Sequence, residues 1–193
     1  LVLSLFSNDT YFFRSGGSLI PTEETDTQIE MVEEVISITL NEKYYEVNVT
    51  FDFYNHGDTV TIAVGFPYFE IGLSGKGSLY DFKCWTNGKE TNYADQPISN
   101  EWNNTHYGSP ELINAYVRDV TFPAKTNTKT IVNFKSSYGL EAPSWQMADY
   151  LYGTGSSWKN KIGKITLIVT NNLLNRRIIS VKMAQKNVMN SVK

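Results

Sequence analysis

The feature that most constrains the fold is a pair of alternating segments between Tyr45 and Pro67. In the first segment every second residue is apolar, and the apolar set is Tyr45, Val47, Val49, Phe51 and Phe53. In the second segment the same pattern is carried by Val60, Ile62, Val64 and Phe66. A period of two separates the side chains of a β-strand onto two faces, so each segment predicts a strand with one buried face.

A short turn sequence, Asn55-His56-Gly57-Asp58, joins these two segments. Residues of these types favour tight turns, and two alternating runs joined by a short glycine-containing loop are typical of a β-hairpin. We therefore expect an antiparallel hairpin that buries Phe51 and turns Asp52 towards solvent. Pro67 should end it, because proline has no N–H to donate to a ladder.

Further strands are expected along most of the chain. Residues 28–40 fit either a helical face or a strand, and their β-branched content favours a strand at least from residue 34. Asn87-Gly88 is a strong signal for a two-residue hairpin turn, here between residues 79–85 and 89–93. The remaining expected strands span residues 115–122, 129–138, 163–170 and 176–183.

These segments amount to roughly ten short strands with turn residues between them, the pattern of an all-β, antiparallel β-sandwich. We find no internal repeat or linker, so residues 1–193 are interpreted as a single β-sandwich domain. Residues 1–7 begin with an apolar run and have two interpretations. They are either the remnant of a secretory signal peptide or a first β-strand.

Charge and cysteine content narrow the classes of function. The net charge of −3 argues against nucleic acid as a partner, because proteins that bind nucleic acid usually carry a basic stripe. A single cysteine, Cys84, excludes an internal disulfide framework and a multi-cysteine zinc site. It lies in an expected strand, which favours a buried, unreactive thiol. No stretch is long and apolar enough for a transmembrane segment.

Large aromatic side chains in or beside loops are the candidate ligand-binding residues. Exposed rings near Asn and Asp side chains can stack on sugars or grip a protein partner. The alternative is that these rings fill the open ends of the sandwich. The candidates are Trp102, Tyr107, Trp145 and Trp158.

Signals for catalysis or metal binding are weak. His56 falls in a turn and is most simply a surface residue, whereas His106 lies in a long loop near Glu101 and Glu111. A metal site there would need more ligands than the sequence shows. No Gly-x-Ser-x-Gly motif is present, and distant triad members cannot be identified from sequence order. We assign no catalytic residue, no metal and no cofactor.

Three pieces of the chain resemble an uncharacterised family of exported bacterial proteins known as domain of unknown function 4424. The first is Asn8-Asp9-Thr10 with Gly16-Gly17-Ser18-Leu19, and the second runs from Ile29-Glu30-Met31 to Val64-Gly65-Phe66-Pro67. The third is Thr154-Gly155-Ser156-Ser157-Trp158-Lys159 with Ile162-Gly163. Gly65 stands where alanine is more usual in the family. The resemblance implies a β-rich fold and export to the periplasm or the extracellular space, and it implies no activity.

The sequence therefore predicts a secreted or periplasmic β-sandwich that binds a protein or a cell-envelope glycan without catalysis, and the resemblance implies that it is bacterial. The alternative function is a hydrolase on the same scaffold, which would require a cleft with two close carboxylates or a His–Ser pair.

Overall fold

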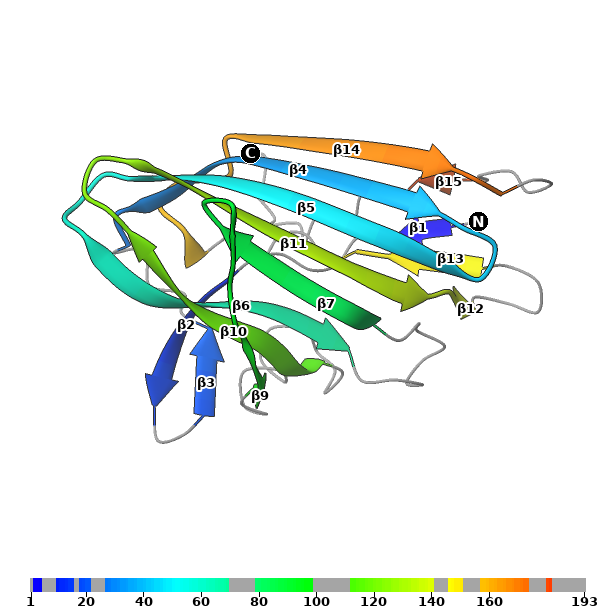
Figure 1. Cartoon of the computed structure of the whole chain (residues 1–193), viewed down its shortest axis with the longest axis horizontal. Coiled ribbons are helices and arrows are strands. Elements are labelled where there is room, and N and C mark those ends of the chain that lie inside the picture. The colour runs from blue at the N-terminus through cyan, green and yellow to red at the C-terminus, as the bar shows by residue number, and fades with distance from the viewer. Residues whose placement is uncertain are drawn as a thin grey trace, which may run out of the picture.

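The computed structural model describes residues 2–4, 10–15, 18–21, 27–69, 79–98, 112–140, 146–150, 157–173 and 180–181. These residues form an all-β sandwich of fifteen strands in three sheets, with no α-helix among them (Figure 1). The predicted fold class is confirmed, and short additional strands raise the number above the roughly ten expected. None of the described segments is a helix long and apolar enough to cross a membrane.

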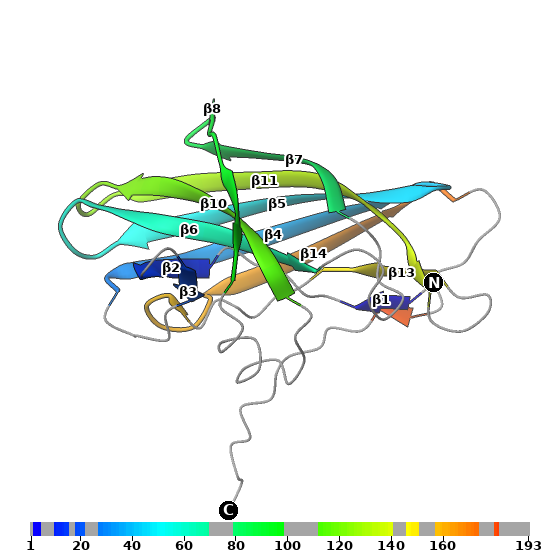
Figure 2. The ribbon, with the colours of Figure 1, turned by 90° about the horizontal axis from the view of Figure 1, so that it is seen from below.

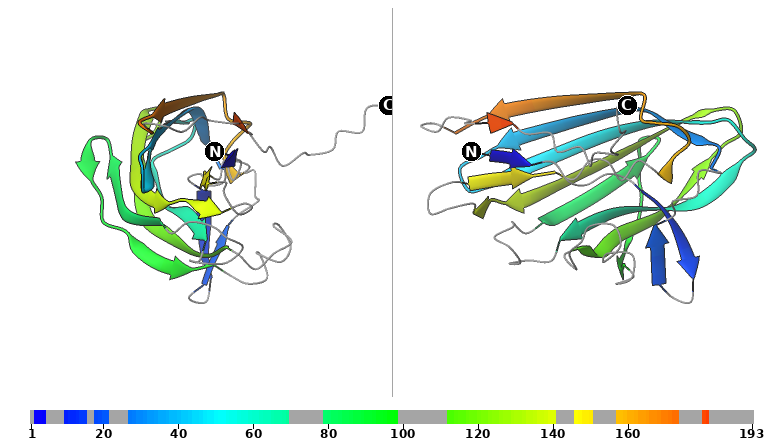
Figure 3. Two further views of the ribbon diagram at one scale, coloured as in Figure 1. Left: turned by 90° about the vertical axis from the view of Figure 1, so that its right-hand side faces the viewer. Right: turned by 180° about the vertical axis from the view of Figure 1, so that it is seen from behind.

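The largest sheet has six strands and makes one layer of the sandwich. Its spatial order is β14 (Lys164–Asn171), β4 (Ile29–Leu40), β5 (Tyr44–Asn55), β11 (Asn127–Ser137), β7 (Leu79–Thr86) and β8 (Lys89–Glu90). All neighbours are antiparallel except β14 and β4, which run parallel. The end-on view of Figure 3 shows this sheet curving from the orange β14 to the green β7 and β8.

A five-stranded antiparallel sheet makes the second layer. Its order is β3 (Ser18–Pro21), β2 (Thr10–Ser15), β6 (Val60–Phe69), β10 (Leu112–Phe122) and β9 (Ala94–Pro97). Figure 2 shows β6 and β10 crossing in front of the longer strands of the first sheet. A small third sheet has the order β12 (Gly139–Leu140), β13 (Gln146–Asp149), β1 (Val2–Ser4) and β15 (Ser180–Val181). Residues 2–4 of the apolar N-terminal run form the strand β1 of this sheet.

The main core lies between the two larger sheets and follows the predicted alternation. Phe51 and Phe53 of β5 are fully buried, as are Val64 and Phe66 of β6. Cys84 of β7 is also fully buried, as expected. Burying an apolar side chain of this size contributes roughly 1.5–3 kcal/mol, so alternation over two long sheets supplies most of the driving force for the sandwich.

The expected hairpin between β5 and β6 is wrong. The two strands do not pair: β5 pairs with β4 and β11, whereas β6 pairs with β10 and β2. The chain instead crosses from one sheet to the other, in a connection that we call the first arch (residues 55–60). Alternation determines which side chains share a face, and it is satisfied equally by a partner in the same sheet or in the opposite one.

A second arch (residues 122–127) joins β10 to β11 and lies against the first, at the left end of Figure 1. The two arches share backbone and side-chain hydrogen bonds. The N–H of Asn55 donates to the carbonyl of Thr126 at 3.2 Å, and the N–H of Ala124 donates to Oγ1 of Thr59 at 3.0 Å. These contacts close one end of the sandwich.

Asn55 is the residue that holds the first arch in place, and it is fully buried. Its Nδ2 donates to the carbonyls of Asp58 at 2.7 Å and Phe122 at 2.9 Å. Its Oδ1 accepts from the N–H of Gly57 at 2.8 Å, which is the local turn that Asn side chains favour. The bond to Phe122 reaches across to β10, so one side chain fixes both arches.

The Asn87-Gly88 turn is confirmed. Both residues have positive φ, 49° and 80°, and β7 and β8 pair across them. Positive φ at both central positions is the requirement of a type I′ turn, which glycine and asparagine meet most easily. The strand expected at residues 163–170 is also confirmed, as β14.

Candidate ligand-binding site

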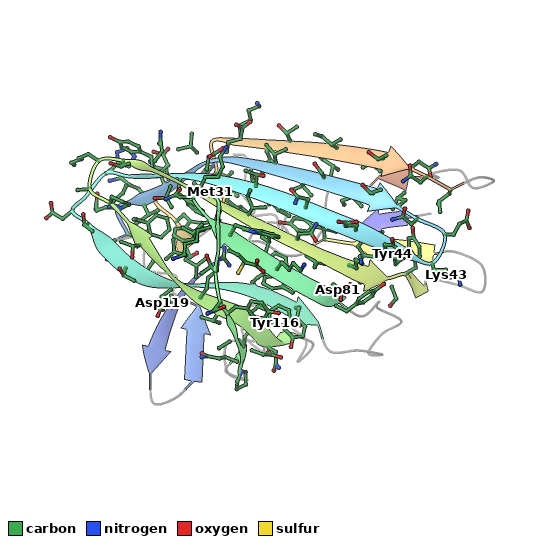
Figure 4. All side chains as sticks on the ribbon, in the orientation of Figure 1. Met31, Lys43, Tyr44, Asp81, Tyr116 and Asp119 are labelled. Carbon is green, nitrogen blue, oxygen red and sulfur yellow. The ribbon has the colours of Figure 1, made fainter. Side chains whose placement is uncertain are left out.

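The described residues gather one group of aromatic and polar side chains at the edge of the sandwich, where β7 faces β9 and β10. We call it the tyrosine cluster. It consists of Tyr68, Phe82, Tyr93, Tyr116, Asp95 and Asn114. In Figure 4, Tyr116 lies on β10, in the lower half of the molecule.

Strand register explains why these residues meet. Asn114 of β10 lies opposite Tyr68 of β6, and Tyr116 lies opposite Asp95 of β9. Residues two apart on a strand share a face, so these side chains point to the same side of the five-stranded sheet. Phe82 reaches them from β7 in the other sheet, with its ring 4.4 Å from that of Tyr116.

The rings pack against each other closely. Tyr68 stacks on Tyr116 with centroids 4.6 Å apart and an interplanar angle of 19°. Tyr93 makes edge-to-face contacts with Phe82 and Tyr116, with ring centroids 4.9 Å and 5.0 Å apart. Such offset and edge-to-face pairs stabilise by about 0.5–1.5 kcal/mol beyond their burial. The cluster is therefore a fixed surface rather than a set of mobile side chains.

Asp95 is the polar centre of the cluster. Its Oδ2 accepts from the Tyr68 hydroxyl at 2.7 Å, and its Oδ1 accepts from Nδ2 of Asn114 at 3.0 Å. The same amide nitrogen lies 3.3 Å from the Tyr68 hydroxyl oxygen, to which it donates. The three side chains form a closed network that orients the carboxylate, and the Asp95 residue remains exposed.

Burial raises the pKa of all three tyrosines above its ordinary value. For Tyr68 burial is the main cause, and the hydrogen bond to Asp95 raises the pKa further. Burial is also the main cause for Tyr116 and Tyr93. All three phenols are therefore neutral at physiological pH, where they act as donors and acceptors of hydrogen bonds.

None of the four aromatic residues predicted from the sequence to bind a ligand belongs to the tyrosine cluster. Trp102, Tyr107 and Trp145 lie outside the described residues. Trp158 is only 1% exposed and packs in the core, 4.8 Å from the Phe53 ring and 6.2 Å from the Phe122 ring. A ring buried in this way cannot stack on a ligand in this structure. Trp158 instead fits the alternative given for these rings, that they fill an end of the sandwich, because it packs in the core near the arches.

Sequence reasoning missed the tyrosine cluster because its members come from four separate parts of the chain. A partial signal was present: the loop expected to carry Trp102 and Tyr107 joins β9 to β10, the strands that supply Asp95 and Asn114. The predicted aromatic loop thus starts and ends at strands of the cluster.

The described residues contain no group of three or more His, Cys, Asp or Glu side chains that could hold a metal ion. His56 lies in the first arch, where its Nε2 is 2.6 Å from Oε2 of Glu30 and its ring contacts Tyr54 at 4.7 Å. His106 lies outside the described residues. The carboxylate of Glu34 is fully buried, and it accepts a hydrogen bond from the hydroxyl of Tyr150 at 3.0 Å.

Comparison with known proteins places the fold. No protein-family model and no curated protein matches the chain. A proposed nutrient binding protein of Legionella pneumophila subsp. pneumophila has a similar structure, with a TM-score of 0.57, 20% identity and coverage of 81% of this chain and 51% of that one. This chain therefore spans about half the length of the Legionella protein. An M1 zinc metallopeptidase from Deinococcus radiodurans matches less well, with a TM-score of 0.31, 10% identity and coverage of 63% and 25%.

At these identities the likeness to the Legionella protein shows a shared fold and nothing more specific. The fold and the cluster together define the class: an all-β sandwich with an exposed tyrosine–carboxylate–amide surface at one edge.

Proposed function

We propose that this protein is an exported β-sandwich that binds a ligand without catalysis, and that the tyrosine cluster is the binding surface. The observation that carries this proposal is the Tyr68–Asp95–Asn114 network beside the exposed Tyr93 ring. Binding sites typically combine aromatic area with a few oriented polar groups. The ligand class is a cell-envelope glycan or a protein partner, and the role ascribed to the Legionella protein supports binding in general.

Two features of the cluster favour binding over catalysis. The carboxylate of Asp95 is already engaged by two donors, and the nearby phenols have pKa values raised away from neutrality. A general base works best with a pKa near the working pH, so phenols shifted upward are poor candidates for that role. Oriented groups of this kind are suited to holding a ligand.

Export is the second part of the proposal. It is supported by the resemblance to exported bacterial proteins of domain of unknown function 4424. Fractionation of cells that express the full natural gene tests it, with the protein detected by antibody. We expect the periplasmic or extracellular fraction, and recovery with the cytoplasmic marker would contradict export.

Binding is tested with the purified protein against isolated cell-envelope glycans and envelope proteins, by surface plasmon resonance. We expect a saturable signal that falls on changing Tyr93→Ala. Tyr80→Ala is the matched control, because Tyr80 is 40% exposed, close to the 41% of Tyr93, and belongs to β7 outside the cluster. Equal signals for the two variants would contradict a role for the cluster.

The alternative, that the protein is a hydrolase, is tested by measuring substrate turnover. Incubation of the wild-type protein with ester, peptide and glycoside substrates should give no turnover. Steady turnover that is lost on changing Asp95→Asn would replace the binding proposal with the alternative.

A further inference from the structure

The exposed ring of Tyr93 is a fixed platform. Its side chain is 41% exposed, and its hydroxyl donates to the carbonyl of Phe82 at 3.1 Å. The ring also makes edge-to-face contacts with Phe82 and Tyr116 of the cluster. A ring held at its hydroxyl and by two neighbouring rings loses little conformational freedom when a ligand stacks on it, which lowers the cost of binding.

The polar groups of the cluster mainly offer acceptors. Each oxygen of Asp95 accepts one hydrogen bond from the cluster, and a carboxylate has about four acceptor sites in total. Asn114 uses its amide nitrogen for both of its contacts in the cluster, so its amide oxygen is a further acceptor. A ligand that fits this surface therefore presents an apolar face to a ring and several hydrogen-bond donors at its edge.

We propose that the tyrosine cluster binds a neutral pyranose sugar, with the C–H face of the ring on Tyr93 and adjacent hydroxyls donating to Asp95 and Asn114. This inference rests on the proposed binding function and narrows its ligand to a carbohydrate. A pyranose offers both requirements at once, an apolar face and a rim of hydroxyl donors.

The charge at the site disfavours acidic sugars. Asp95 carries a negative charge at the edge of the platform, and the chain has a net charge of −3. A uronate or phosphate group placed there would face a like charge, which costs binding energy. The surface therefore discriminates between neutral and anionic sugars.

A protein partner fits the described surface less well. A stable protein interface buries more than about 1,000 Å² and has an apolar centre. The exposed large apolar side chains of the described residues come from separate places in the fold: Val32 of β4, Val60 of β6, Tyr80 of β7, Tyr93 beside β9 and Ile168 of β14. The cluster itself is small and contains a charge, which suits one or two sugar rings.

The test is isothermal titration of the whole chain with neutral disaccharides (cellobiose, maltose, lactose and N,N′-diacetylchitobiose) and with digalacturonic acid. We expect at least one neutral sugar to bind, and digalacturonic acid to bind at least about tenfold more weakly. Tyr93→Ala should weaken the neutral sugar by about tenfold, the effect of losing roughly 1.4 kcal/mol of stacking. Tyr80→Ala should leave its affinity unchanged.

A second variant, at Asp95, tests the effect of the negative charge separately from the effect of stacking on Tyr93. Asp95→Asn should weaken the neutral sugar while reducing the discrimination against digalacturonic acid, because the like charge has been removed. Chemical-shift changes in labelled protein should centre on Asp95, Asn114 and Tyr93.

Several outcomes would overturn the inference. These are no binding of any neutral sugar at about 10 mM, digalacturonic acid binding as tightly as the neutral sugar, and sugar binding unaffected by both variants. If an envelope protein binds wild type and is lost on Tyr93→Ala while no sugar binds, the proposed binding function stands and the sugar inference fails.

Discussion

Neighbouring residues of β5 point to opposite faces of the sheet. Substituting each of them in turn therefore measures how much burial on each face contributes to stability. Phe51 is fully buried, with its ring 6.2 Å from that of Phe53. Asp52 is half-buried on the other face, where its Oδ1 lies 3.5 Å from Nζ of Lys129. One position along the strand thus exchanges an apolar core for a solvated ion pair.

Phe51→Ala should lower the free energy of unfolding by about 3–5 kcal/mol, through lost burial and the cavity left behind. Asp52→Ala should cost under about 1 kcal/mol, because an exposed ion pair contributes little. Urea midpoints of the two variants check this difference. Equal losses would show that both faces of β5 are buried.

The tyrosine cluster makes stability depend on pH in the alkaline range. The pKa values of Tyr68, Tyr93 and Tyr116 are raised in the folded protein, so the unfolded chain releases these protons at lower pH. Stability is therefore complete below pH 10, near the ordinary tyrosine pKa, and falls as the pH rises from there towards the folded values.

Urea midpoints measured between pH 8 and 11 should fall at the alkaline end, and Tyr68→Phe should make that fall shallower because it removes one of the shifted phenols. Absorbance of tyrosinate during a pH titration gives an independent reading, in which the variant loses a late-titrating group. An unchanged slope and an unchanged titration would remove Tyr68 from this explanation.

At the scale of elements, the two arches determine how the strands are assigned to sheets. The strands themselves and their buried faces were predicted from alternation, because the period of two is visible in the local sequence. The hairpin between β5 and β6 was not correctly predicted. The native partners of β5 and β6 depend on long-range contacts such as the hydrogen bond from Asn55 to Phe122, 67 residues away.

The candidate site was missed for the same reason, because it depends on contacts between distant segments of the chain. Trp102, Tyr107, Trp145 and Trp158 were chosen because large rings in loops are visible in sequence. The residues that meet in the structure depend on the register of β6 with β10 and of β10 with β9, which a local pattern does not contain.

Asn55→Ala tests how much the hydrogen bonds within and between the two arches contribute to stability. The change removes three hydrogen bonds, those with Gly57, Asp58 and Phe122, from a fully buried side chain. Each buried group left unsatisfied costs about 1–3 kcal/mol, so we expect a loss of about 3 kcal/mol or more in the free energy of unfolding.

The control for this variant is Thr61→Ala. It removes the 2.7 Å hydrogen bond between the hydroxyls of Thr61 and Thr121, which is exposed and close to the arches. Its cost in the urea midpoint should stay within about 0.5 kcal/mol. Similar losses for the two variants would mean that Asn55 does not hold the arches.

At the scale of the whole molecule, Trp158 connects the two larger sheets. Its ring contacts Phe53 of the six-stranded sheet and Phe122 of the five-stranded sheet. The segment that carries it is bound to β4, since the N–H of Lys159 donates to the carbonyl of Ile29 at 2.8 Å. Loss of this ring should weaken both sheets together.

Trp158→Ala should cost about 3–5 kcal/mol. Amide hydrogen exchange should show reduced protection in both β5 and β10, because the ring packs on residues of both strands. Trp85→Ala is the control, since Trp85 is only half-buried on β7. Reduced protection in one sheet alone would show that the sheets unfold independently.

The first arch has a consequence for the folding pathway. Residues 44–66 carry every local signal of a hairpin, and a β-hairpin forms within about 1–10 μs, long before distant strands meet. The native chain has to separate these two strands and give each a partner from far along the sequence. We therefore expect a transient non-native hairpin to compete with productive folding, because the native hydrogen bond from Asn55 to Phe122 forms only when two segments 67 residues apart meet.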